Sequence, residues 1–202
     1  MKKFLILLFI IITTFPVISL SQNILEENLI YRGNLAFLQE SDETVTGIVI
    51  SKYENGETKE KGEYVDGLRE LEWKKFHENG KLLSTTNYNK GFKNGTFEVF
   101  FEDGKLKALG SYKNDKEHGN WQELNADGKF LYIGNYENGT MHGRWQMFHM
   151  NGRLYSMGNF LEGKKEGMWE YFDEEGKLNK IQIFENDVLI KCEGRCPEKD
   201  DE

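Results

Sequence analysis

The 202-residue chain combines 21 Gly, 14 Phe, 9 Tyr and 4 Trp with only 2 Pro, a mixture that suits turns and pleated surfaces rather than one large packed core. Acidic residues outnumber basic ones by 34 to 26, which gives a formal net charge of −8. This balance argues against nucleic acid or anionic lipid as the main partner, because both reward clustered Lys and Arg.

The first 21 residues have the composition of a secretory signal peptide. Two lysines precede an apolar run over residues 4–15, and Pro16 and the small-x-small sequence Ser19-Leu20-Ser21 follow it. We therefore predict cleavage before Gln22 and export to the periplasm, the cell surface or the medium, with no integral membrane span after processing. A retained membrane anchor is the alternative, since residues 4–20 lie at the short limit for a span.

Residues 22–46 precede the repetitive part of the chain. The segment from Leu29 to Leu38 predicts a short strand, and the polar residues 39–46 predict a loop. We expect this N-terminal cap to cover the first edge of a sheet, because an uncovered edge would pair with other chains.

A glycine recurs every 24 residues and predicts six repeats over residues 47–190. It follows Asn or Asp in five of the six units, and Asn-Gly or Asp-Gly is the pair that a two-residue type I′ hairpin needs. The repeated glycines are Gly56, Gly80, Gly104, Gly128, Gly152 and Gly176. The fold class is therefore predicted as all-β, an elongated single-layer antiparallel sheet of tandem 24-residue β-hairpins.

All four tryptophans occupy one column of the repeat, namely Trp73, Trp121, Trp145 and Trp169. Counting back from the turn at Asn151-Gly152 places Trp145 opposite Gly158, and Gly143 opposite Phe160. We expect each aromatic ring to cover a glycine of the neighbouring strand, which offsets the weakness of glycine inside a sheet. The tryptophans are therefore predicted to be structural and to share a face with the Tyr and Phe residues of a later column.

A second aromatic column is expected to project from the other face of the sheet. It contains Phe76, Phe100, Phe148 and Phe172, with Leu124 in one unit. These four phenylalanines are candidate partner-binding residues. The sequence leaves open the alternative that they only provide hydrophobic cover for the sheet.

No constellation of residues predicts a catalytic, cofactor-binding or metal site. His118 and His142 share a repeat position in adjacent units, but no carboxylate or thiol is fixed beside them, so we predict no metal. His77 and His149 share another column and are expected to be solvated. A single-layer ribbon also offers little concavity for an active site, and we predict that the protein is not an enzyme.

The sequence from Cys192 to Cys196 is a local feature outside the repeats. In an oxidising compartment these cysteines should form a disulfide, and Gly194 permits the tight loop. Closing so short a loop stabilises the fold by roughly 2 kcal/mol in the chain-entropy model. A redox pair or a metal site would need Cys-x-x-Cys spacing or further ligands. Residues 191–202 are therefore predicted as a disulfide-closed acidic tail.

The repeat columns spell approximately Gly-x-Trp-x-x-Phe-x-x-Asn-Gly-Lys-Leu followed by Gly-x-Tyr-x-x-Gly, which resembles the bacterial variant of the MORN repeat. The resemblance covers residues 47–190 and implies a scaffold that contacts proteins or phospholipid surfaces. Many bacterial chains of this variant are labelled antitoxin components. The chain departs from the pattern at Leu71 in place of the opening Gly, Val49 in place of Trp, and Gln182 in place of the mid-strand Gly.

We therefore expect an exported, non-enzymatic repeat scaffold that presents aromatic and Lys side chains to another macromolecule, an exported or envelope protein. Antitoxin-like neutralisation would require a target that is exported too. The alternative is a carbohydrate- or cell-envelope-binding aromatic repeat protein, which would need solvent-accessible tryptophans. The sequence leaves the oligomeric state open.

Overall fold

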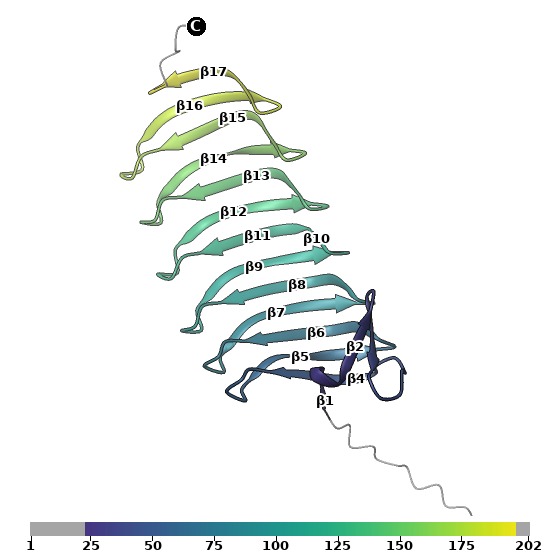
Figure 1. The fold of residues 1–202 in the computed structure, drawn as a ribbon. Helices are drawn as coiled ribbons and strands as arrows, with labels where there is room; N and C mark the ends of the chain where they lie inside the picture. The colour runs from purple at the N-terminus through teal and green to yellow at the C-terminus, as the bar shows by residue number, and fades with distance from the viewer. Residues whose placement is uncertain (1–22, 197–202) are drawn as a thin grey trace, which may run out of the picture.

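The computed structural model describes residues 23–196, most of which form one long sheet of hairpins stacked along a single axis (Figure 1). The predicted signal peptide, residues 1–21, and the acidic end of the tail, residues 197–202, lie outside the described residues. Each strand bends along its length, so the sheet is a curved ribbon (Figure 1). The all-β prediction is confirmed, and the strands of the main sheet follow one another in chain order.

The cap contains β1 (Ile24–Leu25), the 3-10 helix η1 (Glu26–Asn28), β2 (Leu29–Arg32) and β3 (Leu35–Leu38). The six units contribute the strand pairs β4 (Gly47–Lys52) and β5 (Thr58–Val65), β6 (Leu68–Phe76) and β7 (Leu82–Asn89), β8 (Phe92–Phe100) and β9 (Leu106–Lys113), β11 (Gly119–Leu124) and β12 (Phe130–Glu137), β13 (Thr140–Phe148) and β14 (Leu154–Leu161), and β15 (Lys164–Phe172) and β16 (Leu178–Glu185). The short β10 (Lys116–Glu117) pairs with β9, and β17 (Val188–Gly194) forms the last edge of the sheet. Within residues 23–196 no helix is long and apolar enough to cross a membrane.

The turn inside each unit is a three-residue loop, so the predicted two-residue type I′ turn is wrong at this position. In the fifth unit, His149 N–H donates to the carbonyl oxygen of Arg153 (2.8 Å), and Gly152 N–H donates to that of His149 (2.8 Å). Within this loop, only Gly152 has a positive φ, +87°. Asn151 does not have a positive φ, and its side-chain oxygen accepts the N–H of Arg153 at 2.9 Å. This is the pattern of a loop that ends in a left-handed glycine.

Type I′ geometry appears instead in the turns that join one unit to the next. In the turn between β12 and β13, Asn138 and Gly139 have φ values of +53° and +85°. Two consecutive positive φ values match the right-handed twist of the flanking strands. The same two-residue turn recurs at Asp66-Gly67, Lys90-Gly91, Asn114-Asp115, Glu162-Gly163 and Asn186-Asp187.

A β-bulge beside the longer loop restores the predicted register. Phe148 pairs with Leu154 while Met147 pairs with Ser156, so Tyr155 is an extra residue on β14. The bulge compensates for the one-residue difference in loop length, and Trp145 lies opposite Gly158 as predicted. The equivalent extra residues in the other units are Lys59, Leu83, Lys107, Leu131 and Asn179.

The cap differs from the single strand that was expected over Leu29 to Leu38. This segment is a hairpin, β2 and β3, which forms a separate two-stranded sheet. The first edge of the main sheet is covered instead by β1, which pairs in parallel with β4. The hairpin contacts the first turn between units, because Ala36 N–H donates to the carbonyl oxygen of Gly67 at 2.8 Å. Its apolar side chains join a buried cluster that contains Leu29, Ala36, Val45, Val49, Tyr64 and Trp73.

Candidate functional site

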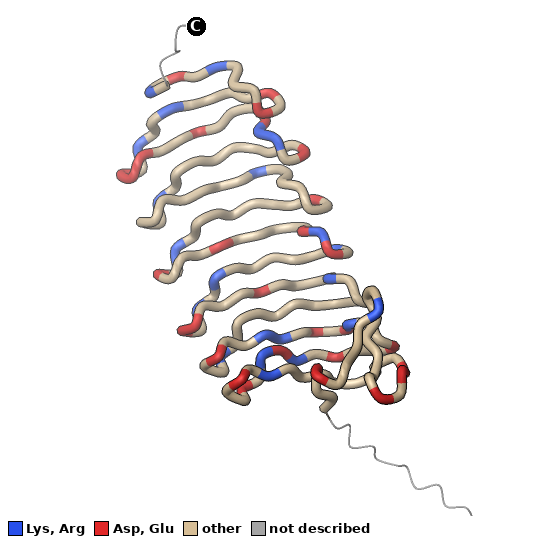
Figure 2. The backbone as a smooth tube through the Cα atoms, in the orientation of Figure 1, with Lys and Arg blue, Asp and Glu red and all other residues tan. Residues whose placement is uncertain are grey.

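The two faces of the ribbon carry different side chains. We call the face that carries Trp73, Trp121, Trp145 and Trp169 the aromatic face, and the other the opposite face. Side chains alternate between the two faces along each strand. Charged residues gather mainly at the turns along the two long sides of the ribbon, as Figure 2 shows.

Each tryptophan ring lies on a glycine of the preceding unit. A Cβ built on Gly134 would lie 2.2 Å from Cδ2 of Trp145, so the ring occupies the space that a side chain at residue 134 would need. Trp145 Nε1–H also donates to the carbonyl oxygen of Asn135 at 3.1 Å. Gly158, which pairs with Trp145 across the hairpin, is covered by Trp169 of the next unit.

The expectation that the ring of Trp145 covers Gly158 is therefore wrong, because the ring covers Gly134 of the preceding unit. The predicted pairing of Trp145 with Gly158 is confirmed. The cause is a second irregularity, at the joint between units. Ile133 pairs with Gln146 and Asn135 with His142, so Gly134 alone faces the three residues 143–145. This wide bulge lets the indole fold back over Gly134. Each tryptophan thus packs its own unit against the preceding unit.

The rings of the aromatic face form a column of ring contacts that crosses four of the joints between units, and we call this column the aromatic ladder. Trp145 makes an edge-to-face contact with Tyr136 of the preceding unit at 5.2 Å between ring centroids, and another with Phe160 of its own unit at 5.7 Å. Such pairs contribute about 0.5–1.5 kcal/mol beyond the area they bury. The ladder therefore supplies stability at the joints between units.

The four tryptophan side chains are almost fully covered. Their exposed fractions lie between 0% for Trp169 and 6% for Trp121. A ring that stacks on a sugar must present one face to solvent. The tryptophan surface that the carbohydrate-binding alternative needs is thus absent from residues 23–196.

One joint between units departs from the ladder. The glycine column has Thr86 here, and the tryptophan column of the next unit has Phe97. Beside them lies a hollow of about 290 Å³, whose lining includes Trp73, Tyr88 and Phe97. The sequence contains a signal for this hollow. Thr86 is larger than the glycine found in other units, and Phe97 is smaller than the tryptophan found in other units.

Charged groups surround this hollow. Arg69 donates two hydrogen bonds of 3.1 Å to the carboxylate of Glu60, and its guanidinium lies over the ring of Trp73 at 4.0 Å. Lys75 Nζ lies 3.8 Å from Glu60, and Lys93 also lines the hollow. The carboxylate of Glu60 thus pairs with both Arg69 and Lys75, and Lys93 adds a further positive charge at the rim.

Three tyrosines in the middle of the aromatic face titrate above their ordinary range. Burial raises the pKa of Tyr132 to about 12, and the nearby charge of Glu123 adds to this effect. Burial also raises the pKa values of Tyr112 and Tyr136, with a further contribution from the charge of Glu117. These phenols therefore remain neutral at any physiological pH.

The predicted partner-binding phenylalanines lie near the turns inside the units. Phe76, Phe100, Phe148 and Phe172 are all half-buried. Strand alternation places them on the opposite face. Phe148 packs against Phe130 at 5.9 Å between centroids. Part of each ring therefore remains available to a partner.

The histidines do not form a metal site within the described part of the chain. No group of three or more His, Cys, Asp or Glu side chains there could hold an ion. His77 and His149 were expected to be solvated, but each ring is half-buried. Nε2 of His77 lies 3.1 Å from the carbonyl oxygen of Phe100, and Nε2 of His149 lies 2.9 Å from that of Phe172. These imidazoles link neighbouring units.

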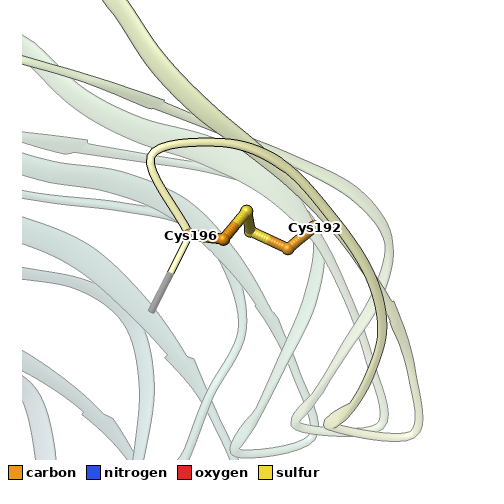
Figure 3. Close-up of a disulfide and its surroundings, with 2 residues drawn as sticks. All are labelled: Cys192 and Cys196. Atoms are coloured by element: carbon orange, nitrogen blue, oxygen red, sulfur yellow. A yellow bond between two sulfur atoms is a disulfide. The ribbon is translucent and has the colours of Figure 1, made fainter. Parts of the chain in front are cut away.

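The predicted disulfide between Cys192 and Cys196 is present (Figure 3). Cys192 belongs to β17 and pairs with Gln182 of β16. Gly194 has a φ of +93°, and a Cβ there would lie 2.6 Å from the carbonyl oxygen of Asn179. Only glycine fits this close approach, so the residue that permits the short loop is also required by packing.

Comparison with known proteins gives one family. The family model described as "MORN repeat variant" matches residues 45–66, 69–90, 93–114 and 165–186. No curated protein matches the chain.

Two solved structures show weak likeness. A mutant of S. aureus TarM in complex with fondaparinux, alpha-GlcNAc-glycerol and UDP is 18% identical, with a TM-score of 0.31 over 47% of this chain and 19% of that chain. The GtfA/B complex bound to UDP and GlcNAc is 16% identical, with a TM-score of 0.22 over 65% of this chain and 23% of that chain. The chain therefore spans about a fifth of the length of either structure.

Proposed function

This chain is a MORN-repeat protein of the variant type, and from that premise we propose that it is a non-enzymatic scaffold that binds another protein. MORN repeats suggest a repeat scaffold for interactions. The observation that best supports the proposal is the way in which the repeat units stack into an extended ribbon. The units stack in chain order, with ring contacts of the aromatic ladder at four of the joints, and the sheet offers two long faces to a partner.

The proposed contact surface on the opposite face is the row of Phe76, Phe100, Phe148 and Phe172. Aromatic side chains are enriched in the buried centres of protein interfaces. The rings recur at the same repeat position in four units, with Leu124 at that position in the unit between Phe100 and Phe148, so a partner with a matching extended surface could contact several of them together. Neutralisation of an exported target protein, as an antitoxin would do, is one form this role could take.

We place this role outside the cytoplasm. The disulfide between Cys192 and Cys196 is compatible with an oxidising compartment. The sequence of residues 1–21 supports export, and the partner is then an exported or envelope protein.

Affinity capture with residues 22–202 tests the proposal against separated protein, lipid and polysaccharide fractions of the cell envelope. We expect one protein to be enriched, and we expect it to be lost when Phe100, Phe148 and Phe172 are replaced by Ala. The matched control replaces the exposed residues Phe92, Leu161 and Val188 by Ala, because these lie beside the turns between units. Melting temperatures of both triple variants confirm that they are folded.

Two results would contradict the proposal. Capture of polysaccharide alone would favour the carbohydrate-binding alternative. Capture that both triple variants reduce equally would show that the phenylalanine row is not the contact surface.

A further inference from the structure

The joint between the second and third units differs from the other joints of the aromatic ladder. Four joints bring a Tyr or Phe ring and the following Trp ring to centroid distances of 5.0 to 5.3 Å. The rings at this joint are Tyr88 and Phe97, and they make no such contact among the described residues. The column of rings is therefore interrupted at this joint.

The interruption creates space on the aromatic face. Thr86 occupies the place of the glycine, and Phe97 is smaller than the indole found at the other joints. The resulting hollow of about 290 Å³ has Trp73, Tyr88 and Phe97 in its wall. Sites for whole drug-sized molecules range from about 300 to 1,000 Å³. The hollow therefore suits a single large side chain better than a free small molecule.

The rim of the hollow is positively charged. Arg69, Lys75 and Lys93 carry three positive charges in and beside the rim, and Glu60, which pairs with both Arg69 and Lys75, carries one negative charge, so the excess is two positive charges. Lys93 forms no ion pair among the described residues, and its Nζ lies 4.7 Å from the ring centroid of Tyr112. The chain as a whole carries a net charge of −8, so this local excess opposes the overall charge.

We propose that this hollow binds an aromatic side chain carried on an acidic segment of the partner protein. The guest ring would lie between Tyr88 and Phe97 and complete the column of edge-to-face contacts. Carboxylates on either side of the guest ring would pair with Lys75 and Lys93. The inference rests on the proposed scaffold function, because it names one site on the ribbon and the chemistry of the segment that the site takes.

A labelled peptide with one Phe flanked on each side by two Asp residues serves as the probe, and fluorescence anisotropy measures its binding to residues 22–202. We expect the peptide to bind, and we expect replacement of its Phe by Ala to weaken binding by roughly tenfold, which is the size of one aromatic contact. Equal binding of the two peptides, or binding of neither, would overturn the proposal.

Two sets of variants locate the site. The double variant Thr86→Gly/Phe97→Trp should complete the ladder, keep or raise the melting temperature, and abolish peptide binding. The variant Lys75→Ala/Lys93→Ala should also weaken binding. Its matched control is Lys61→Ala/Lys74→Ala, which removes two exposed charges from the opposite face of adjacent strands. Unchanged binding by the ladder-completing variant, or equal losses in the two lysine pairs, would show that the peptide binds elsewhere.

The affinity capture described above separates this proposal from the broader one. If a partner protein is captured equally by the natural chain and by Thr86→Gly/Phe97→Trp, the hollow is not its site and the scaffold function stands. If no protein is captured while the peptide binds as expected, the scaffold function fails and the hollow remains a site for acidic aromatic segments.

Discussion

At the scale of single residues, the position that opens each unit has a left-handed backbone. Five units place glycine there, whereas the second unit places Leu71, with a φ of +57°. A left-handed conformation costs an ordinary L-residue about 1–2 kcal/mol. The side chain of Leu71 is 63% exposed, so its burial offsets little of this cost.

Replacing Leu71 by Gly should therefore raise the free energy of unfolding. We expect a gain of about 0.5–1 kcal/mol, because the relief of strain exceeds the extra chain entropy of glycine, which is about 0.5–1 kcal/mol. Urea denaturation at neutral pH measures the change.

Gly143→Leu is the reverse substitution at the same repeat position and provides the control. Gly143 has a φ of +67°, and a Cβ added there would meet nothing within 4 Å. The substitution should cost about 0.5–1 kcal/mol, because backbone strain of about 1–2 kcal/mol is partly offset by the chain entropy that glycine would have lost on folding. If neither substitution changed stability, the left-handed backbone at this position would not carry strain.

At the scale of the repeat unit, the pairing of glycine with tryptophan holds the joints together. Gly134→Thr would force a side chain into the space of the Trp145 ring, and overpacking of this kind costs about 1–3 kcal/mol. Trp145→Phe alone would lose the hydrogen bond to Asn135 and part of the ring contact. The natural joint with Thr86 and Phe97 indicates that the two changes are compatible when they occur together.

The double variant Gly134→Thr/Trp145→Phe should therefore be destabilised by less than the sum of the two single variants. The expected coupling is about 0.5–3 kcal/mol, the range for residues in direct contact, and a double-mutant cycle from denaturant unfolding measures it. Strict additivity would mean that the ring does not rest on Gly134.

The sequence predicted the repeat period, the six hairpins, the pairing of Trp145 with Gly158 and the disulfide. These four features depend on residue type and spacing, which can be read directly from the aligned repeats. It did not predict that the ring of Trp145 lies on Gly134, because that contact depends on a wide bulge between units. Turn type was also missed, since Asn-Gly fits both a type I′ turn and a three-residue loop closed by left-handed Gly152.

The hollow beside Phe97 could also not be predicted without the structure. Thr86 and Phe97 are separate departures in separate columns of the sequence. The structure shows that Thr86 and Phe97 meet where successive units pack, and that together they line the hollow.

At the scale of the whole molecule, both ends of the aromatic ladder are closed. The first unit has Val49 in the tryptophan column, and the described residues before this unit, 23–46, form the cap rather than a further repeat. Val49 packs instead in the cap cluster. The last unit has Gln182 in the glycine column, opposite the disulfide-bonded Cys192, and no tryptophan follows it. The first and sixth units thus depart from the repeat where they adjoin the cap and β17, as capping repeats do.

The stability of the ribbon should fall when the pH is raised above 10. Tyr112, Tyr132 and Tyr136 have pKa values raised by burial, that of Tyr132 to about 12, and burial raises the pKa of Tyr31 in the cap as well. The phenol of an unfolded chain titrates near pH 10. Above that pH the unfolded chain releases protons that the folded chain keeps, so the free energy of unfolding decreases as pH rises. The contribution of these groups is complete below about pH 10 and is lost as the pH passes through the folded values.

Urea denaturation at intervals from about pH 9 to about pH 12 measures this decrease. Tyr132→Phe removes one of the titrating groups and should make the decrease shallower, while the two proteins should differ little in slope at neutral pH. Because Tyr31 belongs to the cap and the other three tyrosines to the central units, the loss should be shared along the ribbon. A stability that is flat up to pH 12, or a slope that Tyr132→Phe leaves unchanged, would show that Tyr132 is not held neutral by its place on the aromatic face.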